Sequence, residues 1–172
     1  MPEVLRIGWM ERCLAAPLAG IVLLALVSGC GAPPDPLGEA KRLQANLQFQ
    51  NSLAPLRELI DERTEDLEVY LLYGTALIRS GSPSLATWPL RKAMEDPDLT
   101  VRATNLMATA AVHTGNLEAA EEYANMALEI EPDNLEALSI RSMARVQSRR
   151  DYEGALADAD RILELDPENP AP

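Results

Sequence analysis

The sequence predicts an all-α protein assembled from consecutive pairs of helices, and three observations support this prediction. Ala and Leu are abundant, while aromatic residues make up 4% of the 172 residues, which favours closely packed helices over a β-sandwich. The segment LEIEPDN at 128–134 recurs as LELDPEN at 163–169. Apolar residues between such segments follow helical spacing, and a period near 34 residues is typical of stacked helical repeats. The alternative is a helical bundle without internal repeats.

The first element is an uncharged segment at 13–27, CLAAPLAGIVLLALV. It is short for a membrane span and is followed by small residues, as is the apolar core of a secretory signal peptide. Two arginines precede it, although two acidic residues dilute their positive charge. Translation from Met10 instead of Met1 would give a more typical signal peptide, so both start positions remain open.

The segment Leu26-Val27-Ser28-Gly29-Cys30 follows this apolar core. It resembles the lipobox of bacterial lipoproteins, in which the Cys thiol is joined to diacylglycerol and the chain is then cut just before it. The resemblance implies that residues 1–29 are a lipoprotein signal peptide and that Cys30 carries fatty acyl chains such as palmitate. Under the sorting rule of enteric bacteria, Gly31 rather than Asp in second place permits export to the outer membrane, facing the periplasm, and the inner membrane stays open as the alternative. The alternative is a plain signal peptide or anchor helix with an incidental Cys.

The segment GAPPDPLG at 31–38 is interpreted as a stiff spacer, because its prolines favour an extended backbone. Residues 30–36 then comprise the lipidated Cys and this Pro-rich spacer, and helix pairs follow. Pro55 and Pro89 occupy the same place in the first two pairs and should kink the second helices or delay their start. We place the array at 37–169, in units of about 37–66, 67–100, 101–134 and 135–169, with 170–172 as a tail.

The unit at 101–134 shows the repeat pattern most clearly. Its first helix ends at Gly115, and Asn116 is predicted to cap the second helix. Pro132 stops that second helix, and Asp133 with Glu136 can form a capping box for the next one. The apolar stripes of the two helices consist of Leu106, Met107, Ala110 and Ala111, then Leu117, Ala120, Ala124, Ala127 and Leu128.

This pattern resembles the tetratricopeptide repeat, whose small and turn positions here are Ala108, Gly115, Ala120, Ala127 and Pro132. The preceding unit matches at Tyr70, Gly74, Leu77, Gly81, Ala86, Leu90 and Ala93, while its turn proline, Pro97, comes one position early. The following unit matches at Tyr152, Ala155, Ile162 and Pro167, but Arg149-Arg150 replaces the turn Gly and one residue is inserted. The resemblance implies a tetratricopeptide-type α-α superhelix whose concave face is lined by the first helix of each pair.

In tetratricopeptide domains, ligands generally lie along that inner face, so the resemblance implies a peptide-binding groove. Leu71 and Thr75 stand where members that clamp a C-terminal carboxylate have Lys and Asn, so that ligand class is not expected. The remaining apolar strip suits an extended peptide or an amphipathic helix. The alternative is that several of its side chains only pack against neighbouring helices. The predicted groove residues are Leu71, Thr75, Ile78, Arg79, Arg102, Asn105, Thr109, Val112, His113, Ser139, Met143 and Val146.

Composition and motifs argue against several other functions. A formal net charge of −12 disfavours binding to nucleic acid and attachment to anionic lipid through surface charge. The two Cys form no CxxC motif and His113 is the only His, so neither a metal site nor a cofactor is predicted. The sequence contains no phosphate loop, GxSxG or HExxH motif, and it suggests neither an enzyme nor a small-molecule substrate.

Together these features predict a membrane-tethered adaptor or assembly factor that recruits a protein or peptide partner in the bacterial envelope. A non-catalytic regulatory subunit of an envelope enzyme, such as a peptidoglycan hydrolase, is the alternative. A third hypothesis is an enzyme fragment whose catalytic domain lies beyond Pro172. PENPAP at 167–172 stands where repeat arrays have a polar capping helix. The last helix is therefore expected to bind a partner or another copy, or to belong to a truncated product.

Overall fold

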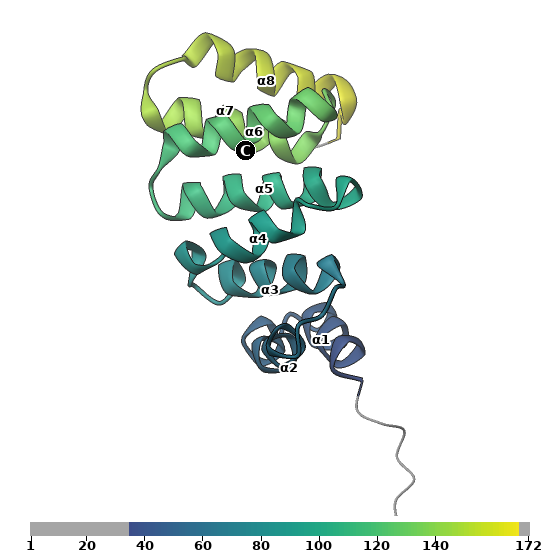
Figure 1. Ribbon diagram of the computed structural model, residues 1–172. Helices are drawn as coiled ribbons and strands as arrows, with labels where there is room; N and C mark the ends of the chain where they lie inside the picture. The colour runs from purple at the N-terminus through teal and green to yellow at the C-terminus, as the bar shows by residue number, and fades with distance from the viewer. Residues whose placement is uncertain (1–34, 169–172) are drawn as a thin grey trace, which may run out of the picture. The chain divides into compact units, whose positions relative to one another are not determined.

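A computed structural model describes residues 35–168, and in this part of the chain it confirms the predicted all-α fold (Figure 1). Each helix packs against the next one along the chain, and α5 also contacts both α3 and α7. The elements are α1 (Pro36–Ala45), α2 (Phe49–Asp61), α3 (Leu67–Arg79), the 3-10 helix η1 (Pro83–Leu85), α4 (Thr87–Ala93), α5 (Pro97–His113), α6 (Leu117–Ile130), α7 (Leu135–Ser148) and α8 (Tyr152–Leu165).

Several predictions concern residues outside this range. The signal peptide at 1–29, the lipidated Cys30 and the tail at 170–172 all lie outside the described residues. Among the helices of 35–168, none has both the length and the apolar character needed to cross a membrane.

Two helices begin earlier than predicted because an Asp-Pro pair starts each of them. The Asp35 carboxylate accepts a hydrogen bond from the Gly38 amide at 2.9 Å, so α1 begins at Pro36, inside the segment interpreted as a spacer. Asp96 caps α5 in the same manner, and Pro97 is therefore the first residue of that helix rather than a turn proline. Pro suits a first helical position because its φ is already helical and it has no amide to satisfy.

Two Asn caps fix the starts of α6 and α7. Asn116 caps α6, as predicted, with its side chain accepting from the Ala119 amide at 3.2 Å. The predicted capping box of Asp133 and Glu136 is wrong, because Asn134 caps α7 and accepts from the Ala137 amide at 2.9 Å. Both carboxylates are then available to side chains of other helices.

The turn within each helix pair contains a residue with positive φ, and these residues recur at the repeat period. They are Leu47 (φ 59°), Gly81 (81°), Gly115 (76°) and Arg149 (57°). Gly adopts this left-handed conformation freely, whereas a side chain there costs about 1 kcal/mol. In the first three turns, the amide of the residue after the positive-φ residue donates to the carbonyl five residues before it, at 2.8–2.9 Å. This hydrogen bond satisfies a carbonyl at the end of the first helix of the pair.

Proline shortens the second helix of one pair, as predicted. The repeat period places the start of that helix at Pro83, but a turn of 3-10 helix stands there and α4 begins only at Thr87. Pro89 is tolerated because it falls among the first residues of α4, whose amides have no partner within the helix. Pro55, by contrast, lies inside α2 and removes one of its hydrogen bonds.

Small side chains occupy the closest contacts between helices. Ala108, Ala120 and Ala124 are completely buried and lie in one cluster between α5, α6 and α7. A Cβ atom on Gly74 would lie 2.5 Å from a methyl carbon of Leu90, which is itself completely buried. Any larger side chain at these positions would force the helices apart.

The turn geometry yields a paired prediction. Arg149→Gly should increase the free energy of unfolding by about 0.5–1 kcal/mol, because it removes the cost of a side chain in the left-handed region. Gly115→Ala is the matched control and should lower stability by about 1 kcal/mol. No atom lies within 4 Å of the added methyl group, so this loss isolates the backbone effect. Urea unfolding followed by circular dichroism measures the stability of both variants. Destabilisation by Arg149→Gly would contradict the conclusion that the left-handed backbone at Arg149 costs stability.

Candidate protein-binding surface

The predicted groove residues lie on α3, α5 and α7, but three of their side chains are buried. Leu71 is 1% exposed, Ile78 is 5% exposed and Asn105 is 2% exposed. Leu71 and Ile78 belong to the apolar core cluster that α3 forms with α4 and α5. These three side chains therefore serve helix packing, and the open strip is narrower than the sequence indicated.

Asn105 ties α5 to the start of α7. Its Nδ2 donates to Asn134 Oδ1 at 3.0 Å and to Glu136 Oε2 at 3.2 Å. Its own Oδ1 is buried without a hydrogen-bond partner. Because both acceptors engage the Nδ2 group, the amide orientation is fixed. A residue predicted to contact a ligand thus sets the spacing of two helices that form the surface.

Two threonines occupy the same repeat position on neighbouring helices of the strip. The Thr75 hydroxyl donates to the Leu71 carbonyl and the Thr109 hydroxyl donates to the Asn105 carbonyl, each at 2.9 Å. Since each hydroxyl proton is already used within its own helix, these half-buried side chains offer a small and mainly apolar contact.

The strip is most open near the end of α7. A shallow cavity of about 240 Å³ is lined there by Ser142, Met143, Val146 and Gln147. Val146 is 47% exposed, while Met143 and Ser139 are half-buried. Two predicted groove residues thus line an accessible hollow, with half-buried Val112 on α5 at the repeat position of Val146.

The predicted basic residues stand on opposite edges of the strip. Arg102 and His113 are both exposed, but Arg102 lies in the second turn of α5 and His113 is its last residue, about 16 Å away at 1.5 Å per residue. The Arg79 guanidinium lies 5.2 Å from the centre of the Phe49 ring, which holds it toward α2. These cations do not converge on one point, so they could contact separate acidic groups of a long ligand.

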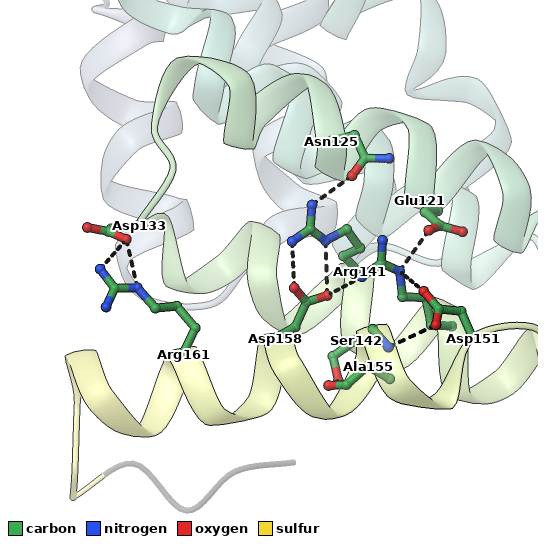
Figure 2. Close-up of polar contacts among 11 residues, drawn as sticks. Glu121, Asn125, Asp133, Arg141, Ser142, Asp151, Ala155, Asp158 and Arg161 are labelled. Carbon is green, nitrogen blue, oxygen red and sulfur yellow. Dashed lines mark hydrogen bonds and ion pairs between the residues drawn. The ribbon is translucent and has the colours of Figure 1, made fainter.

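A polar network between α6, α7 and α8 was not predicted (Figure 2). Two arginines of α7 converge on Asp158 of α8, which is 4% exposed. Arg141 donates to both carboxylate oxygens, with Nε at 2.9 Å from Oδ2, and Arg145 Nη1 lies 3.0 Å from Oδ2. Ser142 adds a hydrogen bond to the Ala155 carbonyl at 3.0 Å.

The same arginines reach back to α6. Arg141 donates to Asn125 at 2.8 Å and Arg145 donates to Glu121 at 2.8 Å. Burial lowers the pKa of Arg145, but the hydrogen bond to Glu121 and the nearby carboxylates outweigh burial and raise it. The network therefore joins the three helices α6, α7 and α8. Within residues 35–168, no three His, Cys, Asp or Glu side chains are placed to hold a metal ion.

A signal for this network existed in the sequence. Asp158 lies between Ala155 and Ile162 on the buried stripe of α8, where the preceding unit has Tyr123. A carboxylate on a buried stripe needs cationic partners, and the arginines of α7 stand one turn apart to provide them.

A second unpredicted surface surrounds the short helix α4. Leu85 is 63% exposed and Trp88 is 59% exposed, and the Trp88 ring meets the Tyr70 ring at a centroid distance of 5.6 Å. The 3-10 turn places these apolar residues outside the core. The cavity beside them measures about 430 Å³ and is lined by Arg57, Ile60, Asp61, Tyr73, Leu77, Leu85 and Trp88.

Comparison with solved structures shows the fold to be that of tetratricopeptide repeat proteins. YrrB, described as a TPR protein with an unusual peptide-binding site, superposes with a TM-score of 0.69 at 17% sequence identity, covering 78% of this chain and 69% of that one. MamA from Desulfovibrio magneticus gives a TM-score of 0.70 at 17% identity, covering 79% and 78%. No family model and no curated protein matches the sequence.

The Asp158 network yields a stability prediction. Asp158→Ala should lower the free energy of unfolding by about 3 kcal/mol, because it leaves two partly buried guanidinium groups without their shared carboxylate. Asp160→Ala, two residues along the same helix at an exposed position, is the control and should change stability by less than about 0.5 kcal/mol. Chemical unfolding of both variants measures the difference, and equal stabilities would show that the network contributes nothing.

Proposed function

We propose that this protein is a scaffold that binds a protein or peptide partner on the surface of α3, α5 and α7. We propose further that a lipid on Cys30 holds it at the bacterial outer membrane, facing the periplasm. The observation that carries the first proposal is the contact of α5 with both α3 and α7, which places equivalent positions of three helices in adjacent rows. Such rows suit a ligand that runs across several helices.

The chemistry of the strip indicates what kind of ligand it fits. Its centre offers Thr75, Thr109 and the apolar hollow of Met143 and Val146, so apolar side chains of the ligand would lie there. Its exposed cations lie on either side of this centre, with Arg102 on one side and Arg79 and His113 on the other, so they would meet acidic groups along the two flanks of the ligand. An extended peptide or an amphipathic helix combines these features over the required length.

The fold comparisons support a binding role in general terms. YrrB is described as having a peptide-binding site, and it shares its fold with this chain. The lipid tether is supported by the lipobox-like segment ending in Cys30 and by the short distance along the chain from Cys30 to the start of α1. The acidic chain would not attach to anionic lipid by charge alone, so covalent lipid is the anchor that fits.

The binding surface can be tested by photo-crosslinking in the native host. A benzophenone amino acid at Val146 should capture a partner, because this position opens onto the apolar hollow. The same amino acid at Ile130, which is 56% exposed at the end of α6, is the matched control and should not capture it. Adding Met143→Asp should remove the adduct at Val146, since it places a charge in the hollow. Identical adducts from both positions would refute this surface.

The identity of the captured partner separates the two roles. An assembly component of the envelope would indicate an adaptor, whereas a peptidoglycan hydrolase would indicate a regulatory subunit.

The anchor has a separate test in detergent phase partition. The intact protein should enter the detergent phase, and Cys30→Ser should move it to the aqueous phase, because it removes the thiol that would be acylated. Cys13→Ser is the control, since this residue lies within the segment expected to be removed. Equal partition of the intact protein and Cys30→Ser would end the lipoprotein proposal and would leave the binding surface unaffected.

A further inference from the structure

The outer face of α8 carries an apolar stripe that the scaffold surface does not include. Tyr152 is 59% exposed, Leu156 is 63% exposed and Leu163 is 42% exposed. Their spacing of four and seven residues places them on one side of the helix. Exposed Glu153 and Asp160 follow in a parallel row beside the stripe.

The preceding repeat shows what covers the equivalent face of α6. Positions in α8 correspond to those thirty-five residues earlier in α6, because the caps Asn116 and Asp151 align at that distance. Leu128 of α6 packs in a cluster with Leu138 of α7 and is only 8% exposed, whereas its counterpart Leu163 is open. Repeating the α6–α7 contact on α8 would therefore bury the stripe.

The α6–α7 contact also specifies charge. Asn125 of α6 accepts a hydrogen bond from Arg141 of α7 at 2.8 Å, and the counterpart of Asn125 in α8 is Asp160. Glu121 accepts from Arg145 at 2.8 Å, and its counterpart is Leu156. A helix that covers α8 thus needs an Arg or Lys opposite Asp160 and an apolar residue opposite Leu156.

We infer that the outer face of α8 is a second docking site, and that its occupant is an amphipathic helix of a partner protein that carries an Arg or Lys opposite Asp160 and an apolar residue opposite Leu156. An acidic row on one side of an apolar stripe favours an occupant with apolar and cationic residues in adjacent rows. This site is separate from the surface of α3, α5 and α7, and it does not depend on the proposed function.

A second copy of this chain fits the site less well. Two α8 helices packed together would bring their acidic rows into proximity, and like charges oppose such a contact. In a head-to-tail arrangement, α1 of the second copy would cover α8. The repeat period places exposed Glu39 of α1 where α7 has Arg141, so this helix would present a carboxylate to Asp160.

The probe for the test is a helix-stapled, fluorescent peptide of residues 135–148 that carries R145L. It keeps Arg141 to face Asp160 and presents an apolar residue to Leu156. Fluorescence anisotropy with the full chain should show binding that Leu156→Asp weakens roughly tenfold or more, because the contact of an apolar side chain is replaced by a buried charge. Leu85→Asp is the matched control, since Leu85 is also 63% exposed, and it should leave binding unchanged.

A charge exchange tests the orientation of the docked helix. Asp160→Lys should weaken binding of this peptide, and a second peptide that also carries R141E should bind the Asp160→Lys protein again. The inference would be overturned if the peptide did not bind, or if Leu156→Asp and Leu85→Asp weakened binding equally. It would also be overturned if the peptide with R141E did not bind the Asp160→Lys protein. Sedimentation equilibrium that shows a dimer of the unaltered protein, lost in Leu156→Asp, would also overturn it by making a second copy the occupant. None of these outcomes changes the crosslinking expected at Val146, which tests the separate surface of α3, α5 and α7.

Discussion

The close approach of neighbouring helices is the constraint on which the rest of this structure depends. At the tightest contacts there is room for no more than a methyl group, as completely buried Ala108 and Ala120 show, and at Gly74 there is not even that room beside Leu90. Because these positions recur at the repeat period, every pair packs at a similar spacing. Equivalent positions of α3, α5 and α7 are consequently placed in rows, and those rows are the candidate surface.

The constraint is local in sequence, and for this reason most of the fold could be predicted. Small residues, turn residues and Asn116 identify helices and their order without knowledge of distant contacts. The failures occurred where two local signals competed. Prolines suggested an extended spacer before α1, but Asp35 followed directly by Pro36 is a strong helix start, and the cap decided the outcome. The same competition moved the start of α5 to Pro97.

The candidate surface was less predictable because the repeat period locates a helix but not the direction of each side chain. Leu71, Ile78 and Asn105 lie on the correct helices, yet they face the neighbouring helices, and a rotation of a few tens of degrees decides between groove and core. Trp88 and the partners of Asp158 were missed for another reason. Their environments are built by residues distant in sequence, and charged residues in a helix ordinarily suggest a solvated face.

The helix α8 departs from the usual order of an amphipathic helix, because a carboxylate lies between Ala155 and Ile162 on its buried side and leucines lie on its outer side. Asp158 can be buried only where two guanidinium groups meet it, so α8 packs on α7 in one rotational position, since any other would leave the charge unpaired. With that rotation fixed, Leu156 and Leu163 must point away from α7. Their exposure therefore follows from the polar contact on the opposite side, and the apolar stripe is a defined surface rather than the result of a loosely packed helix.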